Sequence, residues 1–213
     1  MSTTAVAHAH AGHPPTTTGL DHRKIAIWAF IGSECFFFAS LISTYLIYKG
    51  RSIVGPFPHT AWTDPSTGQH FHPILNIPVT STSTFVLLMS SLAMVLAHAA
   101  VERNDHKWSR IWLLCTAALG ATFLGFQAYE FTSFVHEGLK ITTNLFGSTF
   151  FITTGFHGAH VTAGVLWLIT MYSIDKKRGL GPRDAVNVDV MALYWHFVDV
   201  VWVAIFTFLY LLQ

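Results

Sequence analysis

The sequence predicts an all-α membrane protein, a bundle of five transmembrane helices with its N-terminus inside the cell and its C-terminus outside. Three observations lead to this fold class. Of the 213 residues, 52% are hydrophobic and only 11% are charged, whereas a typical soluble domain has about 25% charged residues. Five apolar segments are each long enough to cross a bilayer, which takes about 20 helical residues. The basic residues are concentrated on one side of these segments.

The five apolar segments are continuous, as in membrane helices, and none alternates in the way that a strand of a membrane barrel requires. They run approximately over residues 25–48, 80–101, 111–131, 147–172 and 190–212. The first 24 residues are rich in His, Thr and Pro, which predicts a disordered cytoplasmic tail. We therefore expect residues 25–213 to form one transmembrane domain, with no second domain and no internal repeat.

The orientation follows from the distribution of Lys and Arg between the connecting segments. With the N-terminus inside, the inner side carries Arg23, Lys24, Arg103, Lys107, Arg110, Lys176, Lys177, Arg178 and Arg183, and the outer side carries Lys49, Arg51 and Lys140. This excess agrees with the positive-inside rule. The net charge is only +1, and no basic cluster has a phosphate-binding pattern, which argues against a nucleic-acid partner.

The two cysteines, Cys35 and Cys115, lie inside predicted helices and are best explained as small packing residues. The sequence has no CxxC pair and no CxxCH motif for haem attachment. Covalently bound haem and a thiolate copper centre are therefore not expected.

The fourth apolar segment contains an unusual polar stretch, GFHGAHVTAG at residues 155–164. At 100° per residue, Thr153, His157, His160 and Gly164 fall within about 60° of one another on one helix face. A stripe of this kind is expected to be buried against protein. Small residues let a neighbouring helix approach closely, and here they are Gly155, Gly158 and Gly164.

Other predicted helices carry polar side chains at membrane depth. Glu34 lies in the first, and His196 and Asp199 lie three residues apart in the last. Gln127 and Glu130, at the same spacing, are expected to close the outer end of the third. Because an intramembrane carboxylate is costly unless it is paired, hydrated or protonated, Glu34 and Asp199 should face the bundle interior.

Some of these residues have the side-chain types of a metal site, namely Glu34, Glu130, His157, His160 and His196. Di-iron bundles, however, carry Glu-x-x-His on two helices, and no predicted membrane segment has that motif. A hydrogen-bonded polar core is therefore the favoured interpretation. In such a core each of the three histidines should bond to a hydroxyl, a carbonyl or a carboxylate.

Several longer stretches carry a family resemblance. The stretches GSTFFITTGFHGAHVTAGV (147–165) and YWHFVDVVW (194–202) resemble the most distinctive parts of subunit III of the haem–copper cytochrome c oxidases. IGSECFFFASLISTY (31–45) resembles the helix in which that family places an intramembrane glutamate, which falls here on Glu34. Residues 75–105 and 119–131 are similar to the next two helices, in the same order.

The resemblance implies a non-catalytic membrane subunit of the short, five-helix bacterial form, in the bacterial plasma membrane. Subunit III of the family binds no haem or copper, which reside in subunits I and II. It packs on subunit I, holds phospholipid in a cleft, and supports proton uptake and stability during turnover. The implied partners are subunits I and II, a small subunit IV, membrane lipids, and cytochrome c as donor through subunit II.

The same resemblance gives roles to the polar residues, none of them catalytic or metal-binding. Glu34 and Asp199 become candidates for proton buffering. The candidates for a structural polar core or for the lipid cleft are Glu130, His157, His160 and His196. For Glu34, a structural role that pins the first helix against its neighbours is favoured, and a proton-relay role is the alternative.

Alternatives to a cytochrome c oxidase subunit remain. Subunit III of a quinol oxidase is the nearest, although such relatives often carry aspartate at the position of Glu34. An independent membrane metalloprotein would use the histidines. A transporter or channel is suggested only by Glu34 and Asp199, and the lack of broken helices and repeats counts against it.

Overall fold

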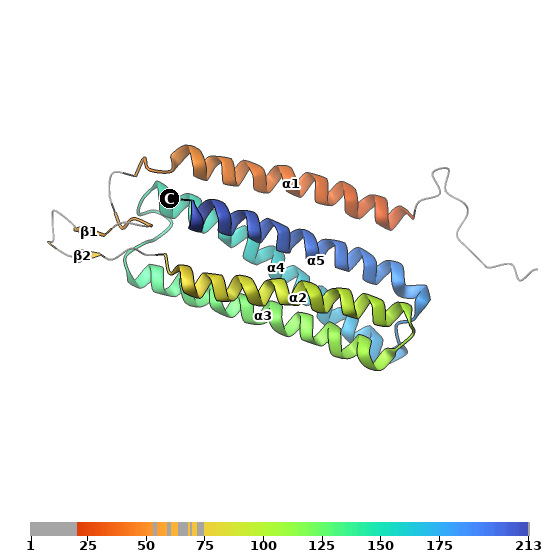
Figure 1. Cartoon of the computed structure of the whole chain (residues 1–213). Coiled ribbons are helices and arrows are strands. Elements are labelled where there is room, and N and C mark those ends of the chain that lie inside the picture. The colour runs from red at the N-terminus through yellow and green to blue at the C-terminus, as the bar shows by residue number, and fades with distance from the viewer. Residues whose placement is uncertain are drawn as a thin grey trace, which may run out of the picture.

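The computed structural model describes residues 21–52, 55–58, 61–63, 68, 70–71 and 75–212, and most of them form a bundle of long helices (Figure 1). The helices are α1 (His22–Tyr48), α2 (Ile77–Glu102), α3 (His106–His136), α4 (Leu145–Arg178) and α5 (Ala185–Ile205). A 3-10 turn (Pro182–Asp184) precedes α5, and a π-helical segment (Phe206–Leu211) extends it. Two short antiparallel strands, β1 (Trp62–Thr63) and β2 (His70–Phe71), lie between α1 and α2.

Capping residues explain where the helices begin. Asp21, Asn76, Asp105 and Asn144 each accept a hydrogen bond from a backbone N–H in the first turn of α1, α2, α3 and α4, the role that Asp and Asn side chains favour. At its other end α4 stops at Gly179, whose φ of +76° suits glycine. Because capping residues precede the apolar runs, the helices begin before the predicted boundaries.

The first helix also corrects the predicted tail. The tail was expected to reach Lys24, but α1 begins at His22. Arg23 donates a hydrogen bond of 2.6 Å to Asn187, and Lys24 forms an ion pair of 2.6 Å with Asp189. These contacts hold the first turn of α1 against the start of α5. Residues 1–20, the rest of the predicted tail, lie outside the described part of the chain.

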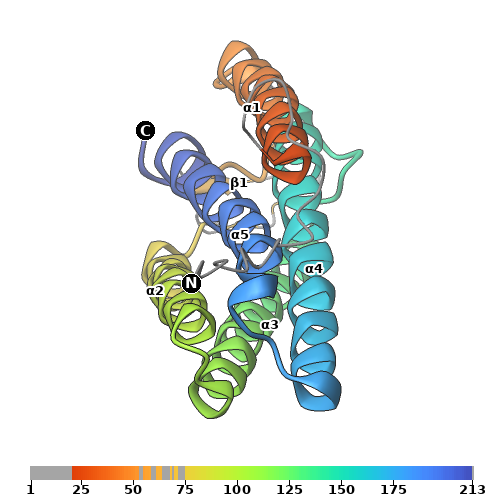
Figure 2. The same ribbon diagram turned by 90° about the vertical axis from the view of Figure 1, so that its right-hand side faces the viewer.

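Helix α5 occupies the middle of the bundle (Figure 2). It packs against α1, α2 and α4, while α3 packs against α2 and α4. At the far end of the bundle, Lys49 donates a hydrogen bond of 2.7 Å to the carbonyl of Leu212. One end of α1 therefore lies beside the start of α5 and the other beside the end of the π-helical segment that extends it, so the described chain begins and ends at opposite ends of the bundle.

Among the described residues, four helical segments are long and apolar enough to cross a membrane: α1, α2, α3, and α5 together with its two flanking turns. The remaining helix, α4, has 34 residues, which is sufficient length, but its sequence is more polar. Its polar side chains at Thr153, Thr154 and His157 are buried in the bundle. The mixed composition of α4 is therefore a consequence of its contacts with other helices.

Close helix contacts surround the Trp195 indole of α5. A Cβ atom added at Gly120 of α3 would lie 2.6 Å from this ring, and one added at Gly164 of α4 would lie 2.7 Å from it. Gly158 of α4 is equally close to the Gln127 side chain. The expectation for Gly155 was wrong, because no atom of another described helix lies within 4 Å of the position that its Cβ would take. Gly155 is two residues from His157 and so faces the other side of the helix.

We predict that Gly164→Ala destabilises the bundle by about 1–3 kcal/mol, because the added methyl group overlaps the Trp195 ring. Gly155→Ala is the matched control, and it should be neutral or slightly stabilising, because alanine has the higher helix propensity. Thermal unfolding of the purified protein in detergent measures both. Equal unfolding temperatures for the two variants would contradict the packing described here.

Candidate functional site: polar side chains of the bundle

Glu34 of α1 and His160 of α4 face each other. Their side chains are 20% and 18% exposed, and Oε2 of Glu34 lies 3.3 Å from Nε2 of His160. Nδ1 of His160 is 2.8 Å from the carbonyl oxygen of Phe156. Because a carbonyl only accepts hydrogen bonds, Nδ1 carries a hydrogen. The free Nε2 edge of the imidazole is therefore the one that faces the Glu34 carboxyl group.

Aromatic groups fix the position of this pair. The Phe38 ring of α1 meets the His160 ring edge-on at a centroid distance of 5.1 Å. From α5, the Tyr194 hydroxyl donates a hydrogen bond of 2.9 Å to the backbone carbonyl of His160. Three helices therefore converge on the pair. As expected, Glu34 is directed toward another helix of the bundle.

A second polar cluster joins α2 to α5. Nδ1 of His196 lies 2.9 Å from the hydroxyl oxygen of Ser91, and the carboxyl group of Asp199 lies near the same hydroxyl. Asp199 is 6% exposed, so the expectation that it is interior is confirmed. Its Oδ1 atom is buried and has no hydrogen-bond partner among the described residues.

Glu130 links three segments at the end of the bundle that holds β1 and β2. It is 4% exposed, it is hydrogen-bonded to the Thr80 hydroxyl of α2, and it accepts a bond of 3.4 Å from the hydroxyl of Tyr210. The expectation that Glu130 closes α3 was wrong, because α3 continues to His136. Glu130 instead holds α3 to α2 and to the segment that follows α5.

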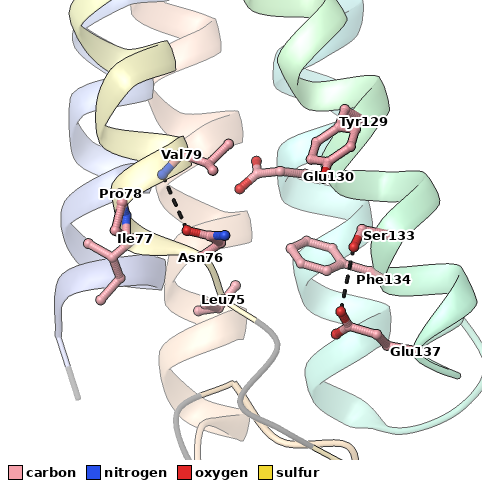
Figure 3. A pocket seen from close by; sticks show the side chains of 10 residues that line it. All are labelled: Leu75, Asn76, Ile77, Pro78, Val79, Tyr129, Glu130, Ser133, Phe134 and Glu137. Atoms are coloured by element: carbon pink, nitrogen blue, oxygen red, sulfur yellow. Dashed lines mark hydrogen bonds between the residues drawn. The ribbon is translucent and has the colours of Figure 1, made fainter.

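A cavity of about 330 Å³ leads toward Glu130 between the start of α2 and the last turns of α3. Figure 3 shows the Glu130 side chain, one of the residues that line this cavity, extending from α3 toward α2. Asn76, Ser133 and Glu137 supply the other polar groups of its wall. Glu130 is therefore a buried carboxyl group beside a polar opening.

His157 differs from the other two histidines. It is fully buried, its ring stacks on Trp202 at a centroid distance of 4.8 Å, and the Phe123 ring lies edge-on at 5.7 Å. Neither ring nitrogen has a hydrogen-bond partner within the described ranges. The predicted hydrogen bond is confirmed for His160 and His196 and wrong for His157, because aromatic rings surround its imidazole.

Comparison with known proteins gives the family. The sequence model for cytochrome c oxidase subunit III matches residues 5–213. The chain belongs to this family. It is 41% identical over 191 residues to a cytochrome c oxidase subunit 3 of Bacillus sp. (strain PS3), covering 90% of this chain and 86% of that protein.

Other relatives of this subunit III are of two kinds. It is 33% identical to a quinol oxidase subunit 3 of Bacillus subtilis, with 95% of this chain and 97% of that protein covered. A cytochrome c oxidase subunit 3 of Synechocystis is 37% identical, with 97% and 80% covered. The predicted family is confirmed: the chain is subunit III of a haem–copper oxidase and an integral membrane protein.

The polar residues of this subunit III are distributed over several places. Thr153, His157 and Gly164 are buried and His160 is partly buried, which confirms the predicted stripe on α4. Among the residues that the structure describes, no three His, Cys, Asp or Glu side chains gather as ligands of one metal ion. The metal site considered from the sequence is not assembled from them.

Asp175, near the end of α4, is a buried carboxylate that the sequence analysis missed. It is fully buried, and it accepts hydrogen bonds from Ser109 Oγ at 2.5 Å and from the backbone N–H of Leu180 at 2.8 Å. Nε of Arg110 is 3.7 Å from its Oδ1. A single acidic residue just before a basic run and Gly179 was the available signal. Asp175 ties the end of α4 to the start of α3.

We predict that Asp175→Ala lowers the free energy of unfolding by about 3 kcal/mol, because it leaves two buried donors, the Ser109 hydroxyl and the Leu180 N–H, without their acceptor and removes the carboxyl group beside Arg110. The matched control is Asp184→Ala, which removes an ion pair with the exposed side chain of Arg178 and should cost less than about 1 kcal/mol. Thermal unfolding of the purified subunit complex measures both, and similar losses would contradict the role given to Asp175.

Proposed function

We propose that this chain is the non-catalytic subunit III of a proton-pumping cytochrome c oxidase in the aerobic respiratory chain of a bacterial plasma membrane. It packs on subunit I, in a complex with subunit II and a small subunit IV. Haem and copper belong to the partner subunits, and cytochrome c delivers electrons through subunit II. The observation that carries the proposal is the family match over residues 5–213.

The choice of cytochrome c as electron donor rests on two observations. The identity to the Bacillus PS3 cytochrome c oxidase subunit is 41%, compared with 33% for the Bacillus subtilis quinol oxidase subunit. The chain also carries Glu34, where the resemblance leads one to expect aspartate in many quinol oxidases. A quinol oxidase is the second candidate, supported by a match that covers 97% of that relative.

In the proposed topology α4 also crosses the membrane, which gives five spans with the N-terminus inside and the C-terminus outside. Helix α4 packs along α1, α3 and α5, all three of which are apolar enough to span. Its last turn carries Lys176, Lys177 and Arg178, and the contact of Asp175 with Arg110 brings this turn to the start of α3. The basic residues therefore gather at one end, which the positive-inside rule makes cytoplasmic.

Phospholipid binding is the second part of the proposed function. At the proposed cytoplasmic end, a cavity of about 280 Å³ lies between α1, α4 and α5. Arg23 and Arg178 line it together with apolar side chains such as Trp167 and Met171. Positive groups above an apolar wall suit an anionic headgroup and the first part of an acyl chain.

The roles of the intramembrane acids complete the proposal. Glu34, paired with His160, and Asp199 are candidates to buffer protons that the oxidase takes up. Glu130, His157, His160 and His196 serve as a structural core around them. The buried contacts of Glu130 with Thr80 and Tyr210 support a structural role for this residue.

We predict that the tagged chain, purified in mild detergent, brings with it a subunit of twelve or more helices that carries two haems and a copper. Mass spectrometry and a reduced-minus-oxidised spectrum identify this partner, and the complex should oxidise reduced cytochrome c faster than a quinol. The isolated chain should be colourless. A stable homomer without haem, or iron, copper or zinc held stoichiometrically by the chain alone, would overturn the proposal.

We predict that Glu34→Gln assembles normally but slows proton uptake by the oxidase, most clearly at high pH, where protons are scarce. Glutamine keeps the shape of the side chain but does not titrate. Glu34→Ala should in addition loosen the contact with His160. Glu137→Gln, at an exposed acid at the C-terminal end of α3, is the control and should behave as wild type.

Proton uptake is measured as the pH change after a single turnover in vesicles, over a range of starting pH. Normal uptake by fully assembled Glu34→Gln at every pH would reject the proton role and leave the structural one. In that case only Glu34→Ala should differ from wild type.

A further inference from the structure

One edge of the His196 imidazole, the edge that carries Nε2, lies on the outside of the bundle. The residue is partly exposed, and its Nδ1 atom is engaged by Ser91 of α2 at 2.9 Å. Its Nε2 atom has no hydrogen-bond partner in the described part of the chain and is not enclosed by it. One nitrogen of the ring is therefore used within the chain, and the other points away from it.

The surface around His196 is otherwise apolar. On α5, Val200 is 68% exposed and Val203 is 40% exposed, and both lie within about 40° of His196 around the helix. On α2, the exposed apolar side chains of Leu88 and Val95 lie one turn before and one turn after Ser91. We call this surface the α2–α5 face, and it consists of Leu88, Ser91, Val95, His196, Val200 and Val203.

The polar edge lies near the middle of the membrane. His196 comes eleven residues after Ala185 at the start of α5, and Ser91 comes eleven residues before Glu102 at the end of α2. Both are therefore about 16 Å from the same end of the bundle, at 1.5 Å per residue. Because the hydrocarbon core of a bilayer is about 30 Å thick, neither headgroups nor bulk water reach His196.

An uncovered imidazole at this depth is costly, since lipid tails offer no hydrogen-bond partner. A second polar atom near Ser91 is also unsatisfied, because Oδ1 of Asp199 is buried and has no hydrogen-bond partner among the residues that the structure describes. Figure 2 shows α1 on one side of α5 and α2 on the other, with no labelled helix over the α5 surface between them. The cluster is therefore incomplete within the described part of this chain.

We propose that the α2–α5 face is the docking surface for a transmembrane helix of another oxidase subunit. That helix carries a hydroxyl, amide or carboxyl side chain at mid-membrane depth, which hydrogen-bonds to Nε2 of His196. The valine and leucine side chains around His196 pack against the partner helix and exclude lipid. The inference rests on the proposed function, because it takes the partner from the same oxidase.

Two substitutions separate this outward bond from the inward bond to Ser91. In His196→Asn the amide takes the place of Nδ1 and keeps only the inward contact, whereas in His196→Gln it reaches the place of Nε2. We expect His196→Asn to lose this chain from the detergent-purified oxidase roughly threefold to tenfold more readily than wild type. His196→Gln should retain the chain almost as wild type does. Equal retention of the two variants, or better retention of His196→Asn, would overturn the proposal.

Photo-crosslinking tests the face itself in the assembled complex. A benzophenone amino acid at Val200, the most exposed position of the face, should crosslink to a membrane subunit other than this chain. Crosslinking only to lipid, or to a second copy of this chain, would reject the face as a docking surface. Such a crosslinking result would leave the proposed function intact as long as the wild-type chain still co-purifies with the haem and copper subunits. Failure of wild type to co-purify would instead reject the proposed function.

Discussion

Hydrogen bonds from α5 to hydroxyl groups of α2 are the interaction on which the rest of the bundle depends. They join Trp195 to Ser90 at 3.0 Å, Trp202 to Thr84 at 2.9 Å, and His196 to Ser91 at 2.9 Å. Between helices in a membrane the hydrophobic effect gives little attraction, so polar contacts and close packing decide which faces meet. Three bonds along one seam fix both the rotation of α5 and its position along α2.

The large aromatic rings of α5 then determine which residues the other helices can carry where they meet α5. Because the Trp195 indole extends to both α3 and α4, these helices carry glycine where it meets them, at Gly120 and Gly164. The Trp202 ring covers the His157 imidazole and leaves it without a hydrogen-bond partner within the described ranges. The glycines and the buried histidine of α4 are thus two consequences of seating bulky aromatic side chains in the centre of the bundle.

The polar residues at membrane depth fall into two kinds because of the same arrangement. Glu34 and His160 lie against each other across α1 and α4, with both side chains of the contact supplied by this chain. Ser91 and His196 satisfy each other only in part and leave one ring nitrogen at the surface. The first pair therefore suits the proposed proton buffering within the chain, and the second suits the proposed contact with another subunit.

The sequence by itself determined the helices, the family and the buried stripe on α4, because apolar length and the 3.6-residue period are local properties. It also placed Asp199 in the interior. Only the tertiary structure decided that Glu34 meets His160, that Glu130 binds Thr80 and Tyr210, and that Asp175 is buried. Such pairings depend on how far each helix is rotated and shifted against its neighbours. No single helix encodes that relation, because it emerges when side chains from all five are packed together.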